Sequence, residues 1–140
     1  MSRDEYLDHL GALPLFAGCS RKDLQRIARV SDEIDVEAGR VLVAEDTIGH
    51  EAYLIVEGTA TVERNGTEVA RLGPGDQFGE LALFDGGRRT ATVTATSPMK
   101  LVVLGQRELA GVVDSVPGLA GKLLASLAAR IRTLDEQAYG

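Results

Sequence analysis

Hydrophobic side chains recur with helical spacing near the start of the chain. Residues 4–10 and 20–30 carry this pattern, and Ser20 is a candidate N-cap for the second predicted helix. The second pattern presents one apolar stripe, formed by Leu24, Ile27, Ala28 and Val30. Pro14 lies between the two patterns, where a helix could not continue, so residues 13–16 are predicted to form a compact apolar connector.

Between residues 32 and 104 the pattern changes to short apolar or alternating runs separated by turn residues. Such a series is typical of an all-β barrel or sandwich, and a recurrence of about ten residues favours a jelly roll or related closed sheet. Asn65-Gly66 separates two of the runs and is a strong hairpin signal, because both central positions of a type I′ turn require a positive φ. The predicted strands cover residues 34–36, 41–43, 52–56, 59–64, 67–72, 90–96 and 100–104.

Residues 105–140 return to helical spacing. A short helix is predicted over residues 106–113, followed by a longer helix with Pro117 in its first turn. In the longer helix, apolar residues recur at alternating spacings of four and three, at Ala120, Leu124, Leu127, Ile131, Leu134 and Ala138.

This narrow apolar seam is typical of helices that pair in a coiled coil, so it predicts a homodimer. The side chains predicted to meet in the dimer are Leu124, Leu127, Ile131 and Leu134. The alternative is a single amphipathic helix that packs on its own domain. Leu119 and Leu123 widen the apolar face near the start of the helix, where it is predicted to lie against the barrel.

Composition places the chain among soluble globular domains. Its 140 residues are enough for one domain, and 44% hydrophobic and 26% charged residues are close to the average for such proteins. The 16 glycines exceed the roughly 10 expected from average usage, which indicates many tight turns. The net charge of −6 argues against a surface that grips nucleic-acid phosphates, but it leaves room for one local basic pocket.

Several functional classes lack the residues they would need. The single cysteine, Cys19, cannot form an internal disulfide, and His9 and His50 are too few and too far apart for a metal site. No Ser-His-Asp set and no Walker-type or G-x-G-x-x-G fingerprint occurs, so neither an enzyme nor a cofactor is predicted. The charged N-terminus is not a secretory signal, and no apolar run is long enough to span a membrane, which predicts a cytoplasmic protein.

Residues 78–93 depart from plain strand alternation and combine a turn, a short helical turn, a loop and a strand. The start of a helical turn leaves backbone N–H groups that favour an anion, and a following arginine offers a planar fork of donors to phosphate oxygens. Glu80 opposes a phosphate by charge, so it is better suited to accept a hydrogen bond from a sugar 2′-OH. An anion and a hydroxyl held together in a barrel indicate a nucleotide. The alternative is a surface loop with an Arg–Glu salt bridge.

The letters F-G-E-L-A-L from Phe78, five intervening residues, and R-x-A-T-V ending at Val93 resemble a known motif. It is the phosphate-binding cassette of cyclic nucleotide-binding domains, a family that includes the bacterial catabolite activator and the regulatory subunits of cyclic-nucleotide-dependent kinases. Other similar features are Leu13-Pro14-Leu15-Phe16, Glu57-Gly58 and Gly73-x-Gly75-Asp76, so that the resemblance covers residues 12–139.

The resemblance implies a mainly β fold with flanking helices, namely a β jelly roll (double-stranded β-helix) with N-terminal helices and a long C-terminal helix. Residues 1–31 would form the N-terminal helical segment. Residues 32–104 would form the jelly roll, with the cassette at 78–93. Residues 105–140 would form the C-terminal helices of the same single domain.

The resemblance also implies roles for the cassette residues. Glu80 would accept a hydrogen bond from the ribose 2′-OH. The backbone N–H groups of Leu81 and Ala82 would hold the cyclic phosphate, with Gly79 allowing close approach. Arg89 would pair with the exocyclic phosphate oxygens.

Three further positions bear on the ligand. Arg88 falls one position outside the motif and is predicted to face solvent. Thr90 can hydrogen-bond the phosphate or the 2-amino group of a guanine. Asp135 falls where family members place a base-contacting residue, and its carboxylate suits guanine better than adenine; an exposed, solvated Asp135 is the alternative. A bacterial-looking composition rich in Ala, Arg, Gly and Val favours cAMP, with cGMP as the alternative.

The sequence therefore predicts a cAMP-binding sensor or regulatory domain that shifts its C-terminal helix when ligand binds. Gly105 or residues 116–118 would serve as the hinge. Alternatives are a cGMP-binding module, a regulatory fragment of a larger transcription factor, kinase or channel, or a dimerisation module without ligand. The sequence does not identify the downstream partner protein. Neither DNA nor a membrane is an expected partner, because the chain is acidic and no recognition helix follows the long helix.

Overall fold

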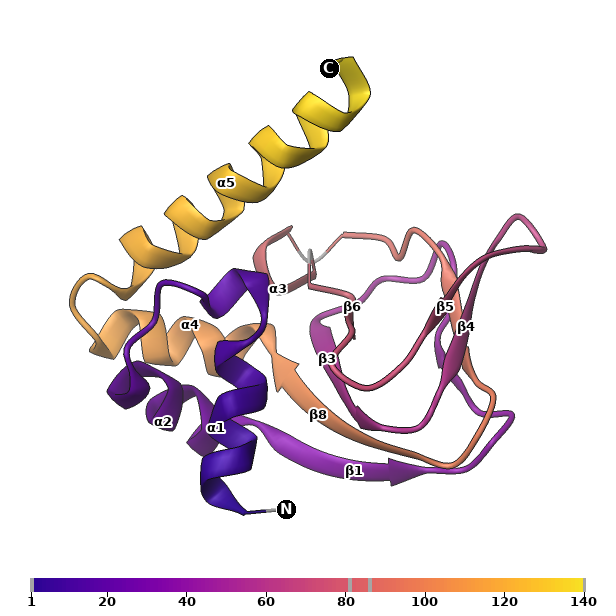
Figure 1. Cartoon of the computed structure of the whole chain (residues 1–140), viewed down its shortest axis with the longest axis horizontal. Helices are drawn as coiled ribbons and strands as arrows, with labels where there is room; N and C mark the ends of the chain where they lie inside the picture. Colours follow the sequence, from indigo (N-terminus) through magenta and orange to yellow (C-terminus); the bar gives the residue numbers. More distant parts are fainter. Residues whose placement is uncertain (1, 81, 86, 140) are drawn as a thin grey trace. The chain divides into compact units, whose positions relative to one another are not determined.

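The computed structural model describes residues 2–80, 82–85 and 87–139 (Figure 1). That description does not extend to the side chains of residues 85, 134, 135 and 137–139. The chain divides into two compact units. Val30–Leu109 contains the strands, and Met1–Arg29 together with Ala110–Gly140 is helical.

The strand unit contains two antiparallel four-stranded sheets within the described residues. Its strands are β1 (Asp32–Val36), β2 (Val41–Val43), β3 (Glu51–Glu57), β4 (Ala60–Arg64), β5 (Thr67–Leu72), β6 (Gln77–Phe78), β7 (Thr92–Ala95) and β8 (Met99–Gly105). One sheet has the order β1-β8-β3-β6 and the other has the order β2-β7-β4-β5. Two four-stranded antiparallel sheets are the arrangement found in jelly rolls, so the predicted fold class, mainly β with flanking helices, is confirmed.

The core of the strand unit is mostly aliphatic. It is formed by Val36, Val43, Ile55, Ala60, Phe78, Val93, Ala95, Met99 and Leu101. These residues come from both sheets, because strand side chains alternate between two faces and the inner faces supply the core. Phe78 also stacks on Tyr53, with ring centroids 4.9 Å apart. This contact fixes the end of the short strand β6, from which the cassette begins.

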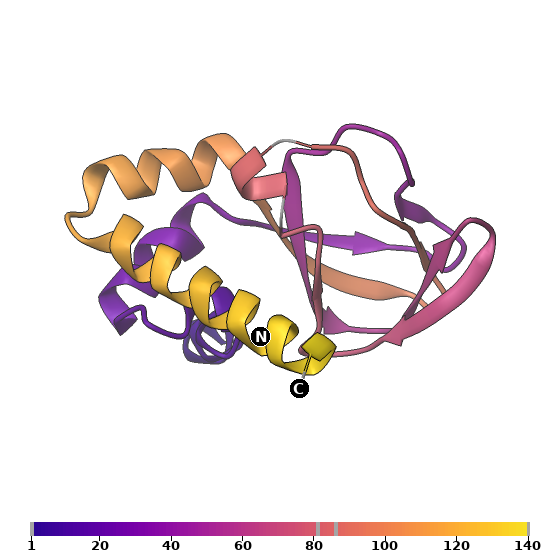
Figure 2. The ribbon, with the colours of Figure 1, turned by 90° about the horizontal axis from the view of Figure 1, so that it is seen from above.

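The β4–β5 hairpin is formed as its turn residues predict. Asn65 has a φ of 54° and Gly66 a φ of 79°, and Arg64 pairs with Thr67 across the two-residue loop. The hairpin extends at one end of the strand unit in both views (Figures 1 and 2).

The helical unit contains α1 (Arg3–Gly11), the 3₁₀ turn η1 (Pro14–Phe16) and α5 (Leu119–Tyr139). Helices α2 (Arg21–Val30) and α4 (Gln106–Ser115) connect this unit to the strand unit along the chain. Ser20 caps α2 as predicted: its Oγ accepts a hydrogen bond from the Asp23 N–H at 3.1 Å, and Asp23 Oδ2 accepts one from the Ser20 N–H at 3.0 Å.

Helix α5 is anchored to the rest of the helical unit near its start. Leu119 and Leu123 are buried, and α5 packs against η1. Lys122 Nζ donates to Asp23 Oδ2 at 2.6 Å. This contact, reinforced by the bonds from Ser20, lowers the pKa of the Asp23 carboxyl below its ordinary value. The nearby Cys19 thiol has a pKa raised by burial and then by the negative charge of Asp23, which keeps it protonated.

The prediction that Pro117 lies in the first turn of the long helix is wrong. Helix α5 begins at Leu119, and Pro117 lies in the turn that joins α4 to α5. Gly118 follows with a φ of 83°, a left-handed conformation that interrupts any helix at this point. The proline therefore belongs to the turn and not to the helix.

Candidate functional site

Arg89 is the residue around which the candidate site is built. Its N–H donates to the carbonyl of Thr47 at 2.7 Å, and its own carbonyl accepts from the Asp46 N–H at 2.9 Å. The Gly49 N–H donates to the carbonyl of Gly87 at 3.2 Å. We call these three bonds the arginine ladder. They join the loop before β3 to the end of the cassette and fix the backbone from which the Arg89 side chain starts.

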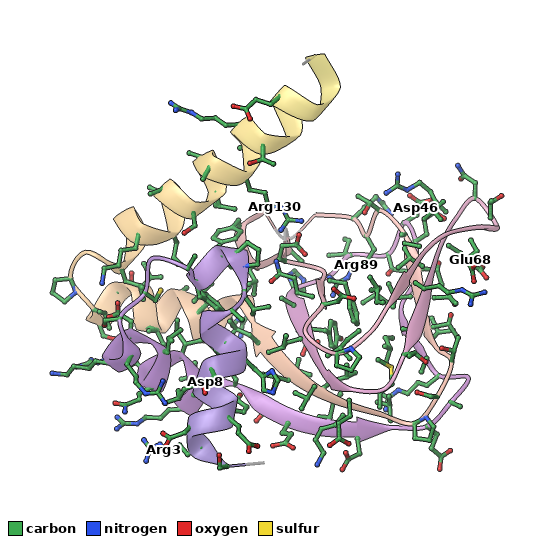
Figure 3. The ribbon with its side chains drawn as sticks, in the orientation of Figure 1. Arg3, Asp8, Asp46, Glu68, Arg89 and Arg130 are labelled. Atoms are coloured by element: carbon green, nitrogen blue, oxygen red, sulfur yellow. The ribbon has the colours of Figure 1, made fainter. Side chains whose placement is uncertain are left out.

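Arg89 is 9% exposed, and its side chain lies among the strands of its unit (Figure 3). Its Nη1 donates to the carbonyl oxygen of Glu51 at 2.9 Å and to that of Gly79 at 3.5 Å. Both acceptors are neutral, so these bonds hold the guanidinium in place without cancelling its charge. A buried cation held in this way is suited to receive an anion.

Arg89 lines a cavity of about 350 Å³ in the strand unit. The other walls are β2, residues 47–51 and Tyr53. This volume falls within the range of small-molecule sites. Burial, and then the negative charge of Glu51, raises the pKa of the Tyr53 phenol, so the ring remains neutral at physiological pH. The cavity thus combines an apolar strand wall, a neutral aromatic residue and a cation.

The cassette turn lies against the same guanidinium. Gly79 has a φ of 78° and supplies a carbonyl to Arg89. The Ala82 N–H donates to the Gly79 carbonyl at 3.1 Å, and the Leu83 N–H donates to the Glu80 carbonyl at 3.2 Å. Ala82 opens the short helix α3 (Ala82–Asp85). The sequence predicts that the Ala82 amide faces an anion, so this amide would have to share or release its bond to Gly79.

The structure brings together Gly79 and Arg89, and the half-buried Glu80 follows Gly79 along the chain. Leu81, the other predicted backbone donor, lies outside the described residues. Thr90 is exposed, and its carbonyl accepts a hydrogen bond from Arg64 Nε at 3.1 Å. Asp135 lies in α5 of the helical unit, and its side chain is outside the description.

Arg88 is exposed, as predicted, and its Nη1 donates to the carbonyl of Asp46. The two adjacent arginines therefore have different environments. Arg89 is buried against the cavity, whereas Arg88 lies on the surface of the same loop.

The sequence pattern does not indicate that residues 47–51 contribute to the site, although they line its cavity. Glu51 contributes its backbone carbonyl and Gly49 a surface without a side chain, so neither residue type signals a binding role. One available signal was the glycine itself, because a glycine at a strand end often marks a close approach of other atoms.

Two other structural observations concern metal sites and membrane-spanning helices. Among the residues that the structure describes, no three His, Cys, Asp or Glu side chains gather where they could hold a metal ion. None of the described helices is long and apolar enough to cross a membrane.

Comparison with known proteins gives a consistent result. Residues 33–115 match the model of the cyclic nucleotide-binding domain. A cAMP-dependent protein kinase regulatory subunit from Eremothecium gossypii is 39% identical over 78% of this chain. The chain spans only 25% of that relative and 58% of a cAMP-activated transcriptional regulator from Mycobacterium tuberculosis, so it matches a part of each.

Solved structures also match. The N-terminal domain of a transcriptional regulator from Streptomyces coelicolor A3(2) is 32% identical, with a TM-score of 0.86, and the match covers 95% of this chain and 96% of that domain. The regulatory domain of Toxoplasma gondii PKA, solved with cAMP, is also 32% identical, with a TM-score of 0.72 over 78% of this chain and 43% of that one. The family match, the jelly-roll topology and the cassette around Arg89 lead to one conclusion: this chain belongs to the cyclic nucleotide-binding domain family.

Proposed function

We propose that this chain is a cAMP sensor that holds the cyclic phosphate at Arg89 and the ribose at Glu80. The observation that carries the proposal is a buried arginine that lines a cavity of about 350 Å³ and contacts the Gly79 turn. The Toxoplasma gondii regulatory domain was crystallised with cAMP, which supports a cyclic nucleotide as the ligand.

The charge of Arg89 favours a phosphate ligand. An ion removed from water is costly unless it is paired, and the carbonyls of Glu51 and Gly79 carry no net charge. A cyclic phosphate is a monoanion with two exocyclic oxygens. Two parallel charge-assisted hydrogen bonds from one guanidinium edge would neutralise the pair and orient the phosphate.

Glu80 is the proposed acceptor for the ribose. It directly follows the Gly79 turn, so it is close to the arginine along the cassette, and a carboxylate accepts hydrogen bonds without donating any. Its charge disfavours a second phosphate at the same place. This combination selects a nucleotide with one phosphate and a free 2′-hydroxyl.

cAMP is the proposed physiological ligand, and cGMP is the second candidate. The exposed Thr90 favours the second candidate, because its hydroxyl can hydrogen-bond a guanine 2-amino group. The relative from Eremothecium gossypii is a regulatory subunit of a cAMP-dependent kinase, and the one from Mycobacterium tuberculosis is a cAMP-activated regulator. Both support cAMP as the ligand.

The proposed output is a homodimer whose long helix changes position. Leu124 and Ile131 of α5 are 66% and 65% exposed, and Leu127 is half-buried between them. Large apolar side chains exposed along one helix face at coiled-coil spacing favour pairing with a second copy. The Gly118 turn before α5 can absorb a change in backbone angles, so it is the proposed hinge.

Calorimetric titration of the 140-residue chain with cAMP, cGMP, AMP and 2′-deoxy-cAMP tests this proposal. We expect cAMP to bind most tightly and 2′-deoxy-cAMP to bind more weakly, because it lacks the hydroxyl that Glu80 accepts. In Glu80→Ala the difference in affinity between cAMP and 2′-deoxy-cAMP should disappear. The same difference in affinity should persist in Glu37→Ala, a control at an exposed position. Absence of binding by every cyclic nucleotide would overturn the proposed function, and tighter binding of cGMP would select the second candidate.

A further inference from the structure

Gly49 lies directly against the guanidinium of Arg89. A Cβ placed on Gly49 would be 2.0 Å from Arg89 Nε, 2.2 Å from Cζ and 2.6 Å from Nη2. These distances are far inside van der Waals contact, so no side chain fits while Arg89 keeps its position. The backbone of Gly49 does not have a positive φ, so the need for glycine here comes from the neighbouring side chain.

The remaining guanidinium nitrogen is held by other atoms. Nη1 donates to the carbonyls of Glu51 and Gly79, and a Cβ on Gly79 would lie 2.6 Å from it. Gly49 therefore borders the Nε and Nη2 part of the guanidinium, and Gly79 borders Nη1. The guanidinium lies in a slot that exists because these two residues lack side chains.

The arginine ladder limits how the slot could widen. Gly49 itself donates to the Gly87 carbonyl at 3.2 Å, and the Arg89 N–H donates to Thr47 at 2.7 Å. The backbone of Gly49, which borders the slot, is thus joined by hydrogen bonds to the backbone segment that carries Arg89. The Arg89 side chain, with several rotatable bonds, is the part that can move most easily.

We propose that Gly49 is a positioning residue for anion binding, whose missing side chain keeps the Arg89 guanidinium in the cavity. This inference rests on the proposed function, because it assigns Gly49 to the same phosphate site. A methyl group at position 49 displaces the guanidinium, so the phosphate loses its charge-assisted partner while the fold is retained.

Gly49→Ala tests this proposal, with Gly73→Ala as its matched control. Gly73 belongs to the same unit, lacks a positive φ, and a Cβ there would have no atom within 4 Å. Calorimetry with cAMP should show a loss of affinity of about 10-fold or more for Gly49→Ala, comparable with losing a charge-assisted bond, and no loss for Gly73→Ala. Equal affinity of the two variants would overturn the positioning role.

A second measurement needs no nucleotide and separates this inference from the proposed function. Urea unfolding is measured for Gly49→Ala, Arg89→Ala and the double variant. If Gly49 contacts Arg89 as described, Gly49→Ala shifts the unfolding midpoint less in the Arg89→Ala background than in the wild type. An equal shift in both backgrounds would overturn the contact.

The same cycle remains decisive if Gly49→Ala does not fold. Recovery of cooperative unfolding in the double variant would support the slot, and failure to recover would overturn it. If the unfolding cycle shows coupling but the wild type binds no cyclic nucleotide, the slot stands as a structural feature while the phosphate role and the proposed function are both rejected.

Discussion

At the scale of single residues, two adjacent arginines carry the same charge in different surroundings. Arg89 is buried, lines the cavity and donates to the backbone carbonyls of Glu51 and Gly79, whereas Arg88 is exposed and donates to the carbonyl of Asp46. A charge contributes to ligand affinity in proportion to how far water is excluded around it. Substituting each residue in turn therefore tests whether ligand affinity depends on the buried Arg89 site or only on the net charge of the protein.

Replacing Arg89 by alanine should weaken cAMP binding by about 10- to 150-fold or more, because losing even one of its two charge-assisted hydrogen bonds has an effect of this size. Arg88→Ala removes the same charge one residue away and should change the affinity by much less. Calorimetry of both variants at one salt concentration makes the comparison. Similar losses in the two variants would show that overall charge, and not the Arg89 site, governs binding.

At the scale of elements, a single carboxylate joins the start of α2 to α5. Asp23 Oδ2 accepts from the Ser20 N–H of the α2 cap and from Lys122 Nζ of α5. Both bonds are stronger when the carboxylate is ionised, so together they lower its pKa. Packing of α5 within the helical unit should therefore depend on pH.

A lowered pKa in the folded state means that Asp23 stabilises the fold at pH values above its unfolded pKa. That contribution is lost as the pH falls through the pKa of Asp23 in the folded protein. Asp23→Asn should thus be less stable than the wild type at pH 7, and the difference should shrink below about pH 4. Urea unfolding at several pH values, from pH 7 down to below about pH 4, measures the difference in stability. Asp114→Asn, at an exposed position of α4, is the control. A difference that does not vary with pH would contradict the assignment.

The same scale shows what the sequence can predict. The Asn65-Gly66 hairpin was predictable because its φ requirement is local, and α2 because its cap and apolar stripe lie within one segment. The start of α5 was not predictable, because proline occurs both in the first turn of a helix and in the turn before a helix. The positive φ of Gly118 decides between these two positions. In the site, Arg89 was predictable from its motif. The contributions of Glu51 and Gly49 were not, because they come from a carbonyl oxygen and from an absent side chain.

At the scale of the whole molecule, the apolar face of α5 determines the expected assembly. Leu124 and Ile131 are two turns apart on one side of the helix and are both largely exposed. In a monomer this surface remains in water, whereas in a two-stranded coiled coil it is buried against the same surface of a second copy.

The double substitution Leu124→Gln with Ile131→Gln should convert the protein from dimer to monomer, because it removes the apolar seam. Ala129→Gln introduces the same side chain at an exposed position outside the seam and should leave the dimer intact. Light scattering on size-exclusion fractions gives the mass of each species. A monomeric wild type, or a double variant that keeps the dimer mass, would contradict the proposed assembly.

The arginine ladder has a further consequence for how the cavity opens. Its donors are the amides of Asp46 and Gly49 in one segment and of Arg89 in the other, and all three belong to one set of bonds between these two segments. If these segments separate as a unit, the three amide protons exchange with solvent in one shared opening event. A phosphate that holds the guanidinium in place would then slow the exchange of all three by the same factor. Opening of the cavity and release of a bound phosphate would then be a single process, recorded in the backbone amides of Asp46, Gly49 and Arg89.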